Sequence, residues 1–223
     1  MTTVNFHPSP LPRYAGWAPF FWMAKHGEKR GGVSALLVTP EIDAGSLIAQ
    51  KRIALSGGET ALAIRQSHFA ASVELLQEVI PLLIHQSFRP VAQNKQERTY
   101  YGKPKEEDYW IDCANERETI LRTVRAGYRS PGAYALTDHG DKLVILSMEA
   151  VDPPEDVSPT VPCGSLYTKY DTLVAARDGW LRIRTIEHNG REVPPDARLL
   201  RGCSSLRVSS PTERLRIPVS RRT

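Results

Sequence analysis

The sequence predicts an α/β chain made of a mixed strand-and-helix region followed by a small β domain. Three apolar or β-branched runs, at 2–6, 32–39 and 47–55, are typical of strands, and a longer run with helical apolar spacing follows at 59–86. The stretch 89–108 is polar and has no apolar period, which predicts a linker. Short strand-like runs then alternate with turn dipeptides, a pattern that favours a small closed or half-closed barrel.

The first region is expected to contain one short helix and one long helix. The short helix is predicted over 17–26, with Pro19 near its start and Gly27 just past its end. The long helix over 59–86 carries an apolar stripe at helical spacing. The stripe consists of Leu62, Phe69, Val73, Leu76, Ile80 and Leu83.

The second region is expected to combine one helix with short strands joined by tight turns. The helix spans 115–127, with Asn115 as its N-cap and Glu118 three residues later. The D-G and N-G dipeptides at 178–179 and 189–190 are typical of hairpin turns between strands. The strands are predicted over 133–137, 142–149, 173–177 and 180–187. The expected domains are 1–88 and 109–210, joined by the linker 89–108 and followed by a basic tail, 211–223.

The composition is that of an ordinary globular protein, with 41% hydrophobic and 24% charged residues among 223. No apolar run is as long as a membrane span and no signal peptide is recognisable, so we expect neither a membrane partner nor secretion. Three cysteines without a C-x-x-C pair, and histidines without ligand spacing, predict no disulfide framework and no metal site, and the expected location is cytoplasmic. Residues 201–223 carry six arginines and one glutamate, which suits contact with phosphates or a solvated end.

The stretch N-F-H-P-S-P-L-P at 5–12 has the features of a strand that ends at a functional loop. Asn5 and His7 are two residues apart on the expected strand, so they point to the same face. The prolines remove backbone N–H groups and fix φ, so the strand has to stop and turn there. Asp43 lies in another loop between strands, two residues before Gly45. Such a trio suits attack of an amine on a carbonyl carbon, because His and Asn stabilise the oxyanion while Asp accepts a proton.

Other interpretations of these residues stay open at the level of sequence. H-P-S-P-L-P has P-x-x-P-like spacing and can be a polyproline II ligand arm. Ser9, His7 and Asp43 can be drawn as a hydrolase triad, although no G-x-S-x-G elbow surrounds the serine. Asp43 can also be an ordinary turn residue.

The motifs N-F-H-P-S-P-L-P-R-Y-A-G (5–16) and I-D-A-G-S-L-I-A-Q (42–50), with P-F-F-W, G-E and G-V between them, resemble those of the 10-formyltetrahydrofolate-dependent formyltransferases. T-Y-Y-G (99–102) and R-A-G-Y-R-S-P-G-A-Y (125–134) resemble the linker and the start of the C-terminal domain in that family. The resemblance implies a partial, Rossmann-like formyltransferase catalytic domain followed by a small OB-like β-barrel domain. It also implies 10-formyltetrahydrofolate as the formyl donor and no metal.

The resemblance assigns roles to individual residues. It implies that Asn5, His7 and Asp43 are catalytic. It implies folate contacts from two loops, the first comprising Ser9, Pro10, Leu11 and Pro12 and the second Thr39, Pro40, Glu41 and Ile42. Ala15 and Trp17 depart from the family, whose members tend to carry arginine after the tyrosine and near the glycine.

A second departure concerns the start of the sequence. The family places several βα units, of about 30 residues each, before the N-x-H strand, and they are not in this sequence. The expectation is a fragment, a mis-started product or half of an enzyme with a separate N-terminal half, and a homo-oligomer is an alternative. The strand at 2–6 would then be a sheet edge open to pairing.

The resulting expectation is transfer of a formyl group to the primary amine of an acceptor, either methionyl-tRNA or an amino-sugar nucleotide. D-A-G and T-Y-Y-G look closer to the sugar-amine type, whereas the basic end suits tRNA. The alternative is a catalytically incomplete formyltransferase-like module that binds nucleic acid or a partner protein.

Overall fold

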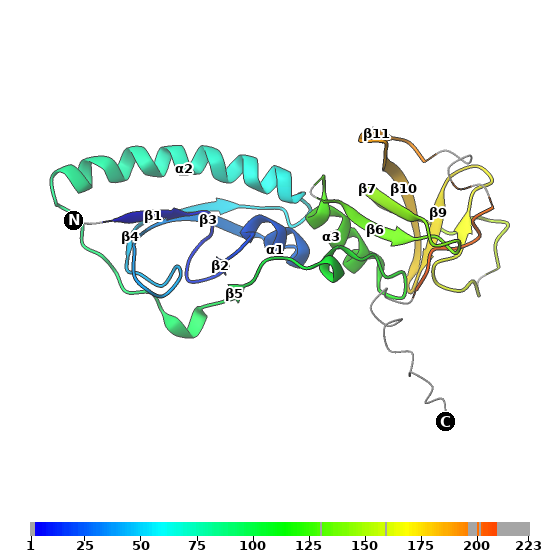
Figure 1. Cartoon of the computed structure of the whole chain (residues 1–223), viewed down its shortest axis with the longest axis horizontal. Coiled ribbons are helices and arrows are strands. Elements are labelled where there is room, and N and C mark those ends of the chain that lie inside the picture. The colour runs from blue at the N-terminus through cyan, green and yellow to red at the C-terminus, as the bar shows by residue number, and fades with distance from the viewer. Residues whose placement is uncertain (1–2, 130, 159, 196–199, 201, 209–223) are drawn as a thin grey trace, which may run out of the picture. The chain divides into compact units, whose positions relative to one another are not determined.

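The computed structural model describes residues 3–129, 131–158, 160–195, 200 and 202–208, so the expected basic tail lies outside the described residues. The chain divides into two compact units, 1–104 and 105–223. Both units mix helices and strands, which agrees with the α/β class expected from the sequence (Figure 1).

The first unit is built on a three-stranded antiparallel sheet with the order β1-β3-β4. Its strands are β1 (Val4–His7), β3 (Arg30–Leu37) and β4 (Leu47–Ala54). His7 lies opposite Ser34 in the register and Asn5 lies opposite Leu36. Among the described residues β1 pairs with β3 alone, so β1 is an edge strand with its last residue at the mouth of the following loop.

The long helix α2 (Ala61–Ile84) covers one face of this sheet (Figure 1). Its buried residues are Ile64, His68, Ala71, Leu75 and Val79, which share a core with Val33 and Ala35 of β3. The apolar stripe that predicted the helix differs for the most part: its member Leu83 packs against this core, but Phe69 is 73% exposed and Ile80 is 44% exposed. By length and composition alone α2 could cross a membrane; core helices of soluble proteins pass the same test, and 22% of the apolar window of α2 is buried.

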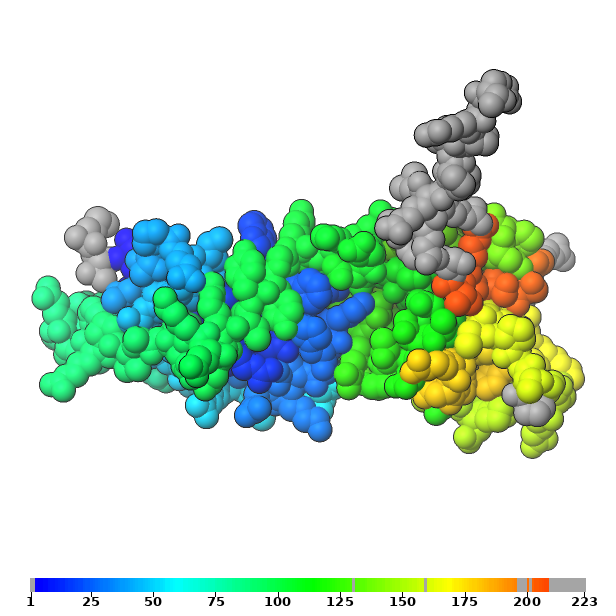
Figure 2. All heavy atoms as spheres, turned by 90° about the horizontal axis from the view of Figure 1, so that it is seen from below, coloured from blue at the N-terminus to red at the C-terminus, as the bar shows by residue number. Residues whose placement is uncertain are grey.

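Loops cover the side of the sheet away from α2 (Figure 1), whereas the short helix α1 (Pro19–His26) packs against α2, where the rings of Phe20 and His68 are in edge contact. The two-residue strand β2 (Ala15–Gly16) pairs in parallel with β5 (Tyr100–Tyr101), and a 3₁₀ turn, η1 (Lys95–Glu97), precedes β5. Figure 2 shows the segment leading to β5, in green, running across the blue residues of this side. The stretch 89–104, expected to be linker, therefore packs within the first unit.

The second unit contains an antiparallel sheet with the order β6-β7-β10-β9-β8, to which β11 adds by pairing with β10. Its strands are β6 (Ala133–Leu136), β7 (Lys142–Val151), β8 (Leu166–Tyr167), β9 (Leu173–Ala176), β10 (Gly179–His188) and β11 (Arg191–Val193). A 3₁₀ turn, η2 (Glu106–Tyr109), and helix α3 (Arg117–Gly127) precede them. In the described part of the chain the ladder is an open path of strands.

Helix α3 begins later than expected and is capped differently. The N-cap residue is Glu116, so the prediction of Asn115 at that position is wrong. The backbone N–H of Arg117 donates to Asp178 Oδ1 at 2.7 Å, so a carboxylate from the turn before β10 satisfies the start of the helix. The face of α3 towards the sheet carries Ile120, Leu121 and Val124, which belong to the core of this unit.

Candidate active site

The loop after β1 is folded tightly onto the sheet. Ser9 N donates to His7 O at 2.9 Å and Leu11 N donates to Ser9 O at 3.0 Å, so the chain reverses directly after the strand. Ser9 is fully buried, and its hydroxyl donates to Arg13 O at 2.8 Å. The stretch is therefore a packed loop rather than a polyproline II arm, and the serine hydroxyl is not directed at His7 as a triad would require.

Two polar side chains of the sheet hold this loop. Ser34 Oγ donates to Ser9 O at 2.7 Å and accepts from Leu11 N at 3.1 Å. Gln50 Nε2 donates to Leu11 O at 2.8 Å and to Ser34 Oγ at 2.9 Å. Since Ser34 is fully buried, each of these bonds replaces one that water would otherwise make. The loop is thus fixed to β3 and β4 through side chains that the sequence motifs alone did not single out.

Folding brings Asn5, His7 and Asp43 together. Asn5 Nδ2 donates to Asp43 Oδ1 at 3.3 Å, and His7 Nδ1 lies 3.4 Å from Asp43 Oδ2. The His7 and Asp43 side chains are 7% and 9% exposed, so their contact is shielded from solvent. The backbone N–H of Gly16 donates to Asp43 Oδ2 at 2.9 Å, which holds the carboxylate from a third direction.

The orientation of the His7 ring follows from a backbone carbonyl. His7 Nε2 lies 3.0 Å from Tyr14 O, and a carbonyl oxygen only accepts hydrogen bonds. Nε2 therefore carries a proton and donates it to Tyr14 O, which leaves Nδ1 facing the carboxylate of Asp43. Two acceptors do not attract each other, so the Nδ1–Asp43 contact is favourable when a proton lies between them.

The loop that carries Asp43 is braced from the stretch 89–104. Gln93 Nε2 donates to Asp43 O at 2.9 Å and to Gly45 O at 2.7 Å, and Arg98 Nη2 donates to Ile42 O at 2.9 Å. A Cβ at Gly45 would lie 1.7 Å from Leu37 O, so only glycine permits this approach to β3. Asp43 has φ of 53°, an uncommon left-handed conformation that these contacts maintain.

The same stretch also holds the first loop. Tyr14 N donates to Thr99 Oγ1 at 2.8 Å, and Ala15 N donates to Thr99 O at 3.0 Å. Gly16 has φ of 94°, and a Cβ there would lie 2.3 Å from Tyr101 O. The parallel pair of β2 with β5 therefore sets the position of the Gly16 N–H that holds Asp43.

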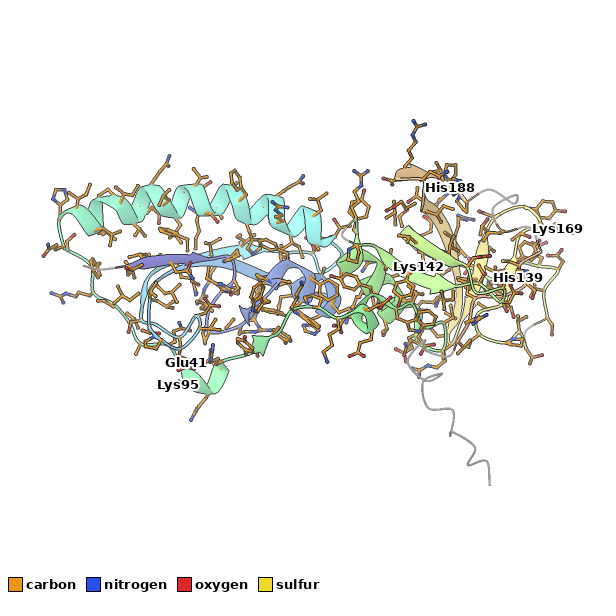
Figure 3. All side chains as sticks on the ribbon, viewed as in Figure 1. Glu41, Lys95, His139, Lys142, Lys169 and His188 are labelled. Carbon is orange, nitrogen blue, oxygen red and sulfur yellow. The ribbon has the colours of Figure 1, made fainter. Side chains whose placement is uncertain are left out.

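The residues expected to contact folate line two separate hollows. One hollow, of about 390 Å³, contains Asn5 and Asp43 together with Thr39, Glu41 and Ile42 of the second loop. Glu41 is exposed on this loop (Figure 3). The other hollow, also about 390 Å³, is lined by Pro10, Leu11 and Pro12 of the first loop. Neither hollow is lined by Ser9 or Pro40.

The second hollow is strongly basic. Besides the first loop it is lined by Arg13, Lys29, Arg30 and Arg52, with Glu97 as its acidic side chain. Arg13 forms an ion pair with Glu28 at 2.5 Å. Among the described residues Lys29, Arg30 and Arg52 take part in no ion pair, so their charges face solvent around the hollow. We name this feature the basic hollow.

Sequence reasoning missed the backbone groups and bracing residues of this site. Tyr14 O and Gly16 N are backbone atoms, so no residue type marks them. Gln50 stands in the motif I-D-A-G-S-L-I-A-Q, but its partner Ser34 lies in an ordinary strand sequence. Gln93 and Arg98 lie in a stretch that its polarity predicted to be a linker. In the structure their side chains donate hydrogen bonds to backbone carbonyls of the loop that carries Asp43.

Two family models match the sequence. The model described as formyl transferase matches residues 1–80. The model described as formyl transferase, C-terminal domain, matches residues 103–203. Together they account for most of both units.

Several solved structures share the fold. HypX from Aquifex aeolicus in complex with tetrahydrofolic acid is 22% identical, with a TM-score of 0.67 over 89% of this chain and 35% of that protein. An N-formyltransferase from Helicobacter canadensis, in complex with folinic acid and dTDP-3-aminofucose, is 17% identical with a TM-score of 0.65 over 81% and 65% of the two chains. A 4-N formyltransferase from Francisella tularensis is 22% identical, with a TM-score of 0.60 over 66% and 62%. The chain spans about a third of HypX and less than two thirds of the others.

Proposed function

This chain belongs to the formyltransferase family, and we propose that it transfers the formyl group of 10-formyltetrahydrofolate to the primary amine of a phosphate-bearing acceptor. We further propose that Asn5, His7 and Asp43 are the catalytic residues. The observation that carries this proposal is their convergence at the end of β1, where Asp43 contacts both other side chains.

The proposed chemistry follows from the protons on these side chains. The amine nitrogen attacks the formyl carbon, and the carbonyl oxygen becomes an oxyanion. When both ring nitrogens of His7 are protonated, Nε2 donates to Tyr14 O, and the Nδ1 hydrogen, which faces Asp43 Oδ2, is shared with the oxyanion as negative charge develops there. Asn5 donates one amide hydrogen to Asp43 and has a second hydrogen for the oxyanion.

Asp43 is the proposed proton acceptor of the reaction. Its carboxylate accepts the proton of the attacking amine, directly or through a water molecule. The oxyanion then collapses to the carbonyl of the new formamide as the bond between the formyl carbon and N10 of the folate breaks. N10 takes the proton that Asp43 accepted, which gives tetrahydrofolate and returns Asp43 to its carboxylate form. Holding Asp43 from three directions keeps the carboxylate in place while charge develops.

Two features support the choice of substrates. The hollow with Asn5 and Asp43 offers a site for the folate, and HypX and the Helicobacter canadensis enzyme have been crystallised with folate compounds. The basic hollow borders the loop that follows His7 and suits the phosphates of an acceptor. An amino-sugar nucleotide and methionyl-tRNA both have phosphates, and the dTDP-sugar complex of a similar fold favours the former.

The test of the catalytic residues is a turnover assay with purified protein, 10-formyltetrahydrofolate and candidate amines, in which tetrahydrofolate release is measured. His7→Ala and Asp43→Asn are expected to lower kcat/KM by about 10²–10⁴-fold, the usual share of acid–base catalysis. His85→Ala, at the exposed end of α2, is the matched control and should turn over normally. Turnover that survives both site substitutions would remove these residues from the mechanism.

The test of the acceptor site uses the basic hollow. Arg52→Ala should raise KM for the acceptor about 5–10-fold and leave the KM for folate unchanged, since a charge-assisted phosphate contact contributes roughly 1–1.5 kcal/mol. Arg65→Ala removes an exposed arginine of α2 outside the hollow and is the control. Equal effects of the two substitutions would argue against acceptor phosphates in this hollow.

The alternative is a binding module without turnover, and the edge position of β1 favours it. The hollow with Asn5 adjoins this edge strand, whose only strand partner among the described residues is β3. Such a module would show no folate binding in calorimetry but salt-dependent binding of tRNA.

We also infer that the second unit is an OB-like, partly closed barrel. The sheet path ends at β6 and β8, and the segment at 205–206 forms isolated bridges beside both ends, Thr137 with Leu206 and Ser165 with Ser205. A segment that reaches both outer strands supports closure of the sheet, as in small barrels. We call residues 202–207 the closing segment.

A further inference from the structure

Asp138, His139 and Cys203 meet at the end of the β6–β7 hairpin, although Cys203 is far away in the sequence. Asp138 and His139 lie in the turn of this hairpin, where Figure 3 labels His139, and Cys203 belongs to the closing segment. One possible ligand atom from each residue lies within 4.8 Å of the other two. We propose that this cluster binds a zinc ion, and we name it the hairpin cluster.

The donor set suits zinc. A thiolate, an imidazole nitrogen and a carboxylate oxygen are the three kinds of ligand that zinc takes in proteins, with water able to fill a fourth position. His139 Nε2 lies 3.7 Å from Asp138 Oδ1. A nitrogen and an oxygen ligand of a tetrahedral zinc ion lie about 3.3–3.5 Å apart, as follows from the usual zinc bond lengths. The two donors on the hairpin therefore need to approach only slightly to bind the same ion.

The surroundings of the hairpin cluster orient its donors. Asp138 Oδ2 accepts from Ser204 N at 2.9 Å and from Ser204 Oγ at 2.7 Å, which directs the other oxygen, Oδ1, towards His139. These hydrogen bonds fix the orientation of the carboxylate, and Oδ1, which also accepts from His139 N at 3.1 Å, is left facing the hairpin cluster. Hydrogen bonds of this kind to a ligand carboxylate are typical of metal sites.

His139 and Cys203 each have to lose a proton when the metal binds. His139 Nε2 lies 2.9 Å from Gly202 O, a carbonyl oxygen that only accepts hydrogen bonds. Nε2 therefore carries a proton, and that proton has to leave before Nε2 can bind zinc. Cys203 is a free, half-buried cysteine, and its sulfur is the third donor. Zinc binding displaces protons of this type and converts the thiol to a thiolate.

The location gives the ion a structural role. The closing segment is fastened to the hairpin by Asp138 N donating to Ser205 O at 3.0 Å and by Arg207 Nε donating to Thr137 O at 3.0 Å. A zinc ion held by Asp138 and His139 on one side and Cys203 on the other adds a cross-link between the same two segments. The ion therefore stabilises the second unit and is separate from the formyl-transfer chemistry proposed for Asn5, His7 and Asp43.

The experiment titrates the metal-free full chain with Zn²⁺ by calorimetry and with Co²⁺ by absorption spectroscopy. We expect one ion per chain, a thiolate-to-cobalt charge-transfer band, and a rise in the Tm of the zinc-loaded protein. Cys203→Ser and His139→Gln should each weaken zinc affinity about 100-fold or more, since each removes a ligand. Cys163→Ser and His188→Ala change a free cysteine and an exposed histidine of the same unit and should bind zinc like the unchanged protein.

Two outcomes would overturn the proposal: absence of stoichiometric binding, or binding that survives loss of Cys203 or His139. A second measurement does not depend on the folding of a variant, because it follows the alkylation of Cys203 in the unchanged protein. Zinc should protect Cys203 from iodoacetamide, as read by peptide mass spectrometry, and leave the labelling of Cys163 unchanged. Equal labelling of Cys203 with and without zinc would reject the site.

Discussion

At the scale of single residues, the candidate active site depends as much on Ser34 as on the three side chains proposed to be catalytic. Its hydroxyl is fully buried, donates to Ser9 O and accepts from Leu11 N and Gln50 Nε2. A buried network of this kind is costly to leave half satisfied. Ser34 therefore fixes the loop that turns the chain back after His7.

Removing this hydroxyl should destabilise the first unit and misplace the loop. Ser34→Ala removes the buried hydroxyl that bonds Ser9 O, Leu11 N and Gln50 Nε2, although Leu11 N still donates to Ser9 O, and we expect a loss of about 1–3 kcal/mol in the free energy of unfolding, measured in urea. Turnover should fall as well, because the loop positions Tyr14 O against His7. Ser72→Ala is the control: its hydroxyl donates only to the carbonyl of His68 one turn back, so its loss should change little. Equal stabilities of the two variants would contradict a bracing role for Ser34.

The residues of the trio could be predicted from the sequence, but the geometry that joins them could not. Strand periodicity predicts that Asn5 and His7 share a face, and prolines mark the end of the strand, whereas the grouping of both with Asp43 in one site is what the family resemblance implies. The hydrogen that settles the His7 tautomer goes to Tyr14 O, a backbone atom, and Asp43 is held by Gly16 N. Backbone groups have no signature in a sequence, so only the fold reveals them.

At the scale of elements, His68 connects α2 to β3. Its Nδ1 donates to Ile64 O at 2.8 Å, and its Nε2 accepts from Gly32 N at 3.1 Å. A Cβ at Gly31 would lie 2.6 Å from the ring, so the absence of a side chain at this position of β3 makes room for the His68 ring. Because Nε2 has to accept this bond, the ring is neutral in the folded protein.

The neutral ring makes the stability of the first unit depend on pH. Burial is the main cause that lowers the pKa of His68 below its usual value of 6.5. As pH falls below 6.5, the unfolded chain binds a proton before the folded chain does, so stability decreases with falling pH. Well above pH 6.5 the ring is neutral in both the folded and the unfolded chain, so the free energy of unfolding no longer depends on its protonation. Urea unfolding of wild type and His68→Gln at pH 7.5 and 5.5 should show the steeper loss in the wild type. His85→Gln, at the exposed end of α2, should keep the wild-type slope, whereas parallel pH profiles for wild type and His68→Gln would refute the assignment.

The helices show why element positions are easier to predict than their contacts. The long helix was expected over 59–86 and lies at 61–84, since periodicity over that length is a strong signal. However, α2 is apolar on two faces, and periodicity alone does not identify which one meets the sheet. The start of α3 is capped by Asp178, sixty-one residues later in the chain, so local capping rules placed it at Asn115.

At the scale of the whole molecule, each unit has its own core, and the second apolar face of α2 is left uncovered. Phe69 is 73% exposed, and Val73, Leu76 and Ile80 are each more than 40% exposed. They follow each other at helical spacing, so together they form one continuous stripe, which we call the outer stripe. Contiguous apolar surface of this kind is uncommon on isolated soluble chains and promotes association.

The outer stripe should therefore control how the chain behaves in concentrated solution. We expect the purified protein to associate as its concentration rises, and the double variant Phe69→Glu with Ile80→Glu to remain monomeric, as measured by sedimentation velocity. Ala70→Glu with Gln77→Glu adds the same two charges to exposed positions beside the stripe, so its association should stay closer to that of the wild type. All four positions are on the solvent side of α2, and their substitution should change the free energy of unfolding by only about 0.5 kcal/mol each. If the control suppresses association as fully as the stripe variant, the cause is net charge rather than apolar contact, and the role assigned to the outer stripe is wrong.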